Sequence, residues 1–199
     1  MVELPELLLA DAAAWRAWLG ENHASSSGVR LVLHKKGGSV TDLSYAAALD
    51  EALCFGWIDG VAGSRDSESQ LRRFTRRTKT SKWSKINTGH FDRLVAQGRM
   101  EAAGLAAAEA AKADGRWEAA YSGQASAEVP DDLAAAIAAN PQAQAMFDVL
   151  TATNRYALIY RTTSVKTPAV RAANVARFVQ MLASGEAPYP QRRKPAGTV

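Results

Sequence analysis

Apolar residues recur at helical spacing along most of the chain. Near the N-terminus, Trp15, Trp18 and Leu19 fall at i, i+3 and i+4 behind Asp11, a residue type that caps helices well. This pattern predicts an amphipathic helix over residues 12–22 whose aromatic stripe faces the core.

Three short runs break the helical spacing and are rich in β-branched and aliphatic residues. They cover residues 29–35, 57–61 and 70–75, and runs of this kind are typical of strands. The polar stretch 63–69 between the last two predicts a hairpin loop. We therefore expect a three-stranded antiparallel sheet.

The other helices are predicted from their ends, by capping residues before the first turn, proline within it and glycine after the last turn. We expect them from Ser44 to Phe55, from Ser81 or Ser84 to Gly98 with a break near Gly89, from Glu101 to Asp114, and opening at Asp131, Pro141 and Pro168. The fold class that follows is α+β and mainly α, with several helices packed on a small three-stranded antiparallel sheet.

A chain of 199 residues with 47% hydrophobic composition is long enough to bury a substantial core. We expect a single globular domain over residues 1–185, with the sheet and a basic loop within 28–85 and a helical part at 86–185. The proline-rich, basic residues 186–199 are expected to form a flexible tail.

The apolar runs and the single cysteine also predict the cellular compartment of the protein. No apolar run approaches the roughly 20 residues that span a bilayer, and no basic stretch precedes the short leucine cluster at the N-terminus. The single cysteine, Cys54, lies in an apolar run, which predicts a buried thiol in a reducing compartment. We expect a cytoplasmic protein without a membrane span.

The net charge of +4 conceals an uneven distribution. Ten of the 24 basic residues fall in one dense segment and in the tail: Arg72, Arg73, Arg76, Arg77, Lys79, Lys82, Lys85, Arg192, Arg193 and Lys194. The remaining residues carry 14 basic against 20 acidic side chains. The basic segment is therefore the feature that a functional account must explain.

Familiar catalytic motifs are absent from the sequence, which has neither a glycine-rich phosphate loop nor a nucleophile elbow. His23, His34 and His90 stand far apart without metal-ligand spacing. Ser81 and Ser84 are better explained as helix caps beside a charge cluster than as nucleophiles. We expect no metal and no cofactor, and the catalytic residues, if any, remain unknown.

The segment from Arg72 to Lys85 is the sharpest functional signal, because it holds seven cations and no acidic residue. Its aromatic residues Phe74 and Trp83 are expected to stack on a planar ligand or on arginine. A solvated charged face explains the run equally well. We expect an anionic ligand, with nucleic acid as the first candidate partner, because phosphates and unstacked bases suit cations beside aromatic rings.

Two other function classes stay open. An enzyme acting on a small phosphorylated or carboxylated metabolite would use the same arginines as clamps and Asp59 as acid or base, although we expect Asp59 to pair with an arginine. A protein–protein module would use the alanine-rich helix 101–114 to form a homodimer, although packing inside the core is the commoner role of such a helix.

Several short motifs resemble those of the YdeI/OmpD-associated family, named for bacteriocin protection. They are Ala52-Leu53-Cys54-Phe55-Gly56-Trp57-Ile58-Asp59-Gly60, Arg73-Phe74-Thr75, Arg77, Ser81, Trp83-Ser84-Lys85 and Asn87. The similarity continues from Trp15 to Leu182. One departure is Arg76, where the family usually has proline, so the loop is expected to be more mobile and more basic.

The resemblance implies a bacterial intracellular protein associated with a stress response, and no established substrate, cofactor or catalytic residue. Its strongest motifs flank the predicted hairpin. We therefore hypothesise that one ligand-binding cleft is formed by Trp57, Asp59, Arg73, Phe74, Arg77, Ser81, Trp83 and Asn87.

Overall fold

The computed structural model describes residues 4–124, 126–165 and 167–195. These form two compact units, one ending at Ala120 and one beginning at Tyr121, and each has its own cluster of buried side chains. The sequence pattern predicts one domain over residues 1–185. Apolar periodicity marks which residues are buried, but it does not show which of them pack together, and the two cores are therefore visible only in the structure.

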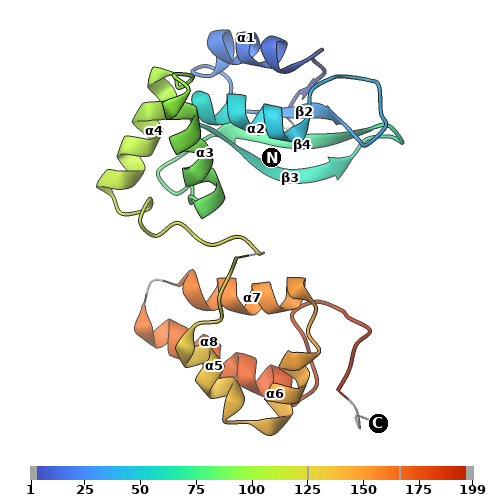
Figure 1. The fold of residues 1–199 in the computed structure, drawn as a ribbon, viewed down its shortest axis with the longest axis vertical. Helices are drawn as coiled ribbons and strands as arrows, with labels where there is room; N and C mark the ends of the chain where they lie inside the picture. The colour runs from blue at the N-terminus through green and yellow to red at the C-terminus, as the bar shows by residue number, and fades with distance from the viewer. Residues whose placement is uncertain (1–3, 125, 166, 196–199) are drawn as a thin grey trace. The chain divides into compact units, whose positions relative to one another are not determined.

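The N-terminal unit combines a sheet with four helices (Figure 1). Its elements are β1 (Glu6–Leu7), α1 (Ala12–Asn22), β2 (Val29–His34), α2 (Tyr45–Cys54), β3 (Trp57–Ser64), β4 (Ser69–Arg76), α3 (Lys85–Ala96) and α4 (Ala102–Ala113).

The sheet of the described residues has four strands in the order β1-β2-β4-β3. The antiparallel pairs β2–β4 and β4–β3 match the predicted strands, but β1 adds a parallel pair, in which Glu6 lies opposite Arg30. The prediction of a three-stranded antiparallel sheet is thus wrong in strand number, and the sheet is mixed and not purely antiparallel, while the mainly helical α+β class is confirmed. A two-residue strand is too short to show any alternation of apolar and polar residues.

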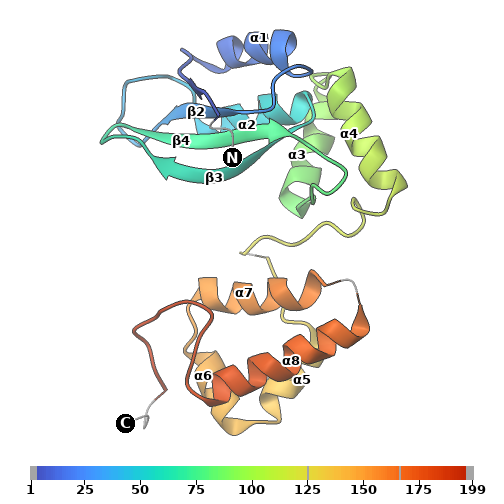
Figure 2. The same ribbon diagram turned by 180° about the vertical axis from the view of Figure 1, so that it is seen from behind.

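Helices α1 and α2 cover the same face of the sheet (Figure 1), and Figure 2 shows the strands in front of α2. Side chains alternate along β4, so Phe74 faces the helices, where its ring centroid lies 5.8 Å from that of Trp15. Arg73 lies on the other face, directly opposite Arg30 of β2. Alternation within β4 therefore separates its aromatic residue, which joins the core, from a surface cation.

Capping residues position the helices of this unit as predicted. Asp11 accepts a hydrogen bond from the Ala14 N–H, and Ser84 accepts one from the Asn87 N–H, so α3 begins after Ser84. The expected break at Gly89 is not present, since α3 continues through this residue to Ala96. Glycine lowers helix stability without necessarily ending a helix.

The C-terminal unit is helical, with α5 (Asp131–Ala138), α6 (Pro141–Asp148), α7 (Ala152–Thr163) and α8 (Pro168–Ala183). Val175, Phe178 and Leu182 are buried along α8 as predicted. Helix α7 was not predicted. Among the residues that the structure describes, every helix is too short or too polar to traverse a lipid bilayer.

The chain after α8 is anchored to the C-terminal unit. The buried side chain of Asn154 accepts a hydrogen bond from the Tyr189 N–H and donates to the Tyr189 carbonyl and to Gln191 Oε1. The Gln191 amide in turn donates to the Val149 carbonyl. These bonds fix the course of residues 189–191, although the same residues were expected to belong to a flexible tail.

Candidate functional site

The three aromatic residues of the hypothesised cleft lie in the core. Trp57 and Phe74 are fully buried and Trp83 nearly so. Trp57 also donates its indole N–H to the His23 carbonyl oxygen at 3.2 Å. Rings without exposed surface cannot stack on a ligand, so the expected stacking role of Phe74 and Trp83 is not supported.

These aromatic residues belong to two different groups. Trp57 makes edge contacts with Trp15 and Trp18, at centroid distances of 6.1 and 5.8 Å. Trp83 instead packs against Trp117, at 4.7 Å. The large side chains therefore stabilise the unit from two places and do not converge on one cleft.

The polar members of the hypothesised cleft have structural contacts as well. Ser81 accepts a hydrogen bond from the Thr78 N–H within a tight turn, and Asn87 is buried in the first turn of α3. The Arg77 guanidinium lies over the ring of Trp83 and donates to the Lys82 carbonyl at 3.1 Å. Arg77 is therefore part of the packing beneath the loop.

Asp59 is held at the edge of the sheet. The Tyr45 hydroxyl donates to its carboxylate at 2.9 Å, and Arg72 lies 3.6 Å away, as the prediction of an arginine partner required. Arg72 also donates to the Gly60 carbonyl and lies over the ring of Tyr45. The Asp59 carboxylate is thus engaged by two neighbours, which does not favour a role as general base.

The structure divides the seven cations of the basic segment into two groups. Arg72 and Arg77 are half-buried and bond within the protein. The other five are exposed: Arg73, Arg76, Lys79, Lys82 and Lys85. We call these five the basic strip. It runs from β4 through the following loop to the first residue of α3, and no aspartate or glutamate occurs between residues 69 and 91.

The loop that carries the middle of the basic strip is held in place by hydrogen bonds to its backbone. Arg116 donates to the carbonyl oxygens of Thr78 and Ser81, at 3.3 and 2.9 Å, and is itself paired with Asp114. The exposed lysines therefore extend from a turn whose backbone is fixed by hydrogen bonds, although the missing proline at position 76 predicted a more mobile loop.

A buried charged centre that was not predicted from the sequence joins α1, α2 and the start of α4. Glu51 is buried between Arg16 and Arg99, and the Arg16 guanidinium also bonds to the Arg99 carbonyl and to Glu101. Asp50, beside it, pairs with Arg93 at 2.6 Å. These charges lie far apart in sequence, and no local motif could have indicated that they meet.

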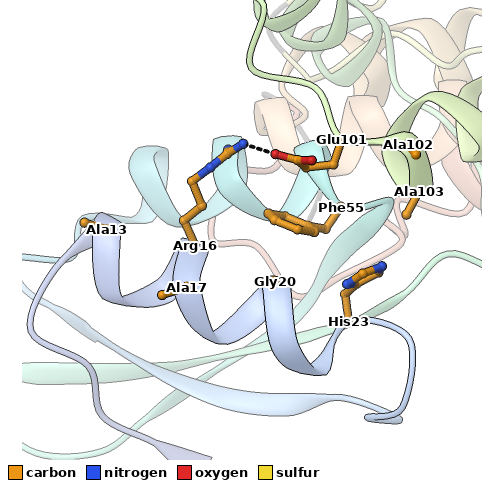
Figure 3. A pocket seen from close by; sticks show the side chains of 9 residues that line it. All are labelled: Ala13, Arg16, Ala17, Gly20, His23, Phe55, Glu101, Ala102 and Ala103. Carbon is orange, nitrogen blue, oxygen red and sulfur yellow. Dashed lines mark hydrogen bonds and ion pairs between the residues drawn. The ribbon is translucent and has the colours of Figure 1, made fainter.

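This centre forms one end of a pocket of about 590 Å³ that is open to solvent (Figure 3). The pocket is lined by Ala13, Arg16, Ala17, Gly20, His23, Phe55, Glu101, Ala102 and Ala103. Figure 3 shows Arg16 and Glu101 facing each other across one end, with Phe55 between them and His23. The side chain of Phe55 contacts both the His23 ring, at 5.2 Å between centroids, and the Arg16 guanidinium.

Among the residues that the structure describes, no group of three or more His, Cys, Asp or Glu side chains is arranged to hold a metal ion. Cys54 is buried below the charged centre, as predicted. Burial raises the pKa of its thiol, which favours the unreactive protonated form.

Comparison with known proteins gives two family matches, one for each unit. Residues 126–185 match the family described as Bacteriocin-protection, YdeI or OmpD-Associated. This confirms the resemblance over part of the chain only, and the motifs from Ala52 to Asn87 that suggested it lie outside the matched residues. Neither curated proteins nor solved structures give a significant match.

The other match covers residues 7–107, and thus the sheet apart from Glu6, the basic strip and the pocket. The family is described as Domain of unknown function (DUF8412). Since these residues make up just over half of the 199-residue sequence, the chain belongs to this family, and its C-terminal helical unit carries the YdeI/OmpD-associated match.

Proposed function

We propose that the N-terminal unit binds a polyanion, and nucleic acid in particular, through the basic strip. The observation that carries this proposal is the division of the seven cations. Two are half-buried, whereas Arg73, Arg76, Lys79, Lys82 and Lys85 are exposed within 13 consecutive residues. Close like charges raise the free energy of the folded protein, and a bound anion offsets that cost.

The burial of the aromatic residues argues against base stacking as the mode of binding. Proteins that prefer single strands stack bases on exposed rings, but Phe74 and Trp83 are buried here. Contacts from lysine and arginine to phosphates carry no base information by themselves. We therefore expect binding that is insensitive to sequence, sensitive to salt and no stronger for single strands than for duplexes.

The other function classes receive less support. The pocket is not lined by any residue of the basic strip, and Asp59 is engaged by Tyr45 and Arg72, which weakens the case for an enzyme with Asp59 as acid or base. Helix α4 buries Gly104, Ala108 and Ala111 in its own unit, which uses the face that a homodimer would need. We also propose a role in a bacterial stress response, and this part rests only on the description of the family that matches residues 126–185.

The proposal is tested by fluorescence anisotropy with a labelled duplex of random sequence and the corresponding single strand, both at low salt. The variant Lys79→Ala/Lys82→Ala removes two charges of the basic strip. Both lysines are exposed, and we expect the variant to fold normally and to bind about tenfold or more weakly than the wild type.

The matched control is Lys36→Ala/Arg177→Ala, which removes two exposed cations outside the basic strip. It has the same net charge as the test variant and is expected to bind almost as tightly as the wild type. Equal loss in the two variants would show that only net charge matters. Absence of binding to the wild type at low salt would reject the proposal.

A further inference from the structure

We propose that the pocket between α1 and α4 binds a small aromatic carboxylate, whose carboxylate group takes the place of Glu101 on Arg16. This site lies apart from the basic strip and does not depend on the proposed function. Arg16 and Glu101 face each other at one end of this pocket (Figure 3).

The two carboxylates bound to Arg16 differ in their freedom to move. The side chain of Glu51 is only 8% exposed and is also bound by Arg99, so it is fixed. Glu101 is 45% exposed, and its side chain makes no capping bond to α4. Glu101 is therefore the partner that another carboxylate can displace without disturbing the core.

Arg16 stays in place when Glu101 leaves. It donates to Glu51 at 2.7 Å and to the Arg99 carbonyl at 3.0 Å, and neither contact involves Glu101. Glu101 is bound through the Arg16 Nη2 group, and a carboxylate that replaces Glu101 is expected to take the same charge-assisted hydrogen bond. A group with the chemistry of the Glu101 side chain already occupies this position, which favours a carboxylate over a phosphate.

The rest of the pocket suits a ring. Phe55 forms one wall and the His23 ring contacts it, while the alanine and glycine residues of α1 and α4 leave open space beside them. Aromatic rings favour tilted or offset contacts of this kind. A cavity of about 590 Å³ falls within the range of small-molecule sites, and an anionic ring compound fits both its ends.

Gly20 gives separate support. It lies inside α1, where alanine would be favoured, and a Cβ at this position would meet no atom within 4 Å. Close packing therefore does not require glycine there. The position lines the pocket, so glycine keeps that wall open.

The experiment uses benzoate as the probe and the full chain, with binding followed by backbone amide NMR shifts at Ala102, Ala103 and His23. Benzamide, which has the same ring without the charge, is the comparison ligand. In the variant Glu101→Gln the competing charge is gone, so benzoate is expected to bind about fivefold more tightly than to the wild type, the factor that one exposed ion pair contributes.

Two further variants make the result decisive. Glu109→Gln removes an exposed carboxylate from the same helix and is expected to leave benzoate affinity unchanged. Ala17→Leu fills the pocket from an exposed helical position and is expected to abolish binding without lowering the melting temperature. The inference is overturned if Glu101→Gln does not strengthen binding, if benzamide binds as well as benzoate, or if Ala17→Leu binds benzoate like the wild type.

Discussion

The Arg77 guanidinium carbon lies 3.6 Å from the ring centroid of Trp83. This contact explains why a cation of the basic segment is absent from the basic strip. Arg77 covers a core tryptophan and bonds to the loop carbonyl of Lys82, so its charge serves folding.

Arg77 and Arg73 are predicted to contribute differently to the free energy of unfolding. Replacing Arg77 by alanine is expected to lower the free energy of unfolding by about 1–2 kcal/mol, because a desolvated cation–π contact and a hydrogen bond are lost. Replacing the exposed Arg73 is expected to change it by less than about 0.5 kcal/mol. Urea unfolding followed by tryptophan fluorescence measures both, since all five tryptophans lie in the N-terminal unit.

Two helical glycines are predicted to respond in opposite ways to alanine. A Cβ at Gly104 would lie 2.2 Å from the Cys54 carbonyl oxygen, so Gly104→Ala forces α4 away from α2. We expect a loss of about 2 kcal/mol or more. Gly20→Ala meets no atom and is expected to stabilise the unit by up to about 1 kcal/mol. Thermal unfolding of the two variants checks the signs, and similar shifts for both would contradict the packing of α4.

The stability of the C-terminal unit is predicted to depend on pH through Asp132. Arg171 of α8 donates two hydrogen bonds to Asp132 of α5, and this pairing lowers the pKa of the Asp132 carboxyl. A depressed pKa in the folded state contributes stability above the ordinary aspartate value of about 3.9, and this stability is lost as pH falls through the folded pKa. Because both groups are exposed to solvent, the contribution is expected to stay below about 1 kcal/mol.

NMR titration of the Asp132 carboxyl carbon tests this directly. Its midpoint should lie below the usual aspartate range in the wild type and should rise toward that range in Arg171→Gln. An unchanged midpoint in the variant would show that the ion pair is not maintained in solution.

Local sequence patterns predicted most helices and the three longer strands, because capping and periodicity are properties of neighbouring residues. Asp11, Ser44 and Ser84 cap helices at the positions expected for them. The short strand β1 and the helix α7 were missed. The first is too short for a pattern, and in α7 buried Asn154 and Thr162 interrupt the apolar stripe.

The candidate site was harder to predict, because its composition does not reveal which side chains are exposed. The seven cations and their neighbouring rings were evident in the sequence, but the alternation of β4 places Phe74 inside and Arg73 outside. The pocket was not predicted, since Arg16, Phe55 and Glu101 come from distant segments that only the fold brings together.

The most direct test of the proposed function is the salt dependence of duplex binding, measured as the logarithm of the association constant against the logarithm of salt concentration. If all five cations of the basic strip contact phosphates, the slope for the wild type should approach about −4.5, at about −0.9 per contact. In Lys79→Ala/Lys82→Ala its magnitude should fall by about 2, and in Lys36→Ala/Arg177→Ala it should stay unchanged. A slope near zero in the wild type, or the same slope in all three proteins, would contradict binding through the basic strip.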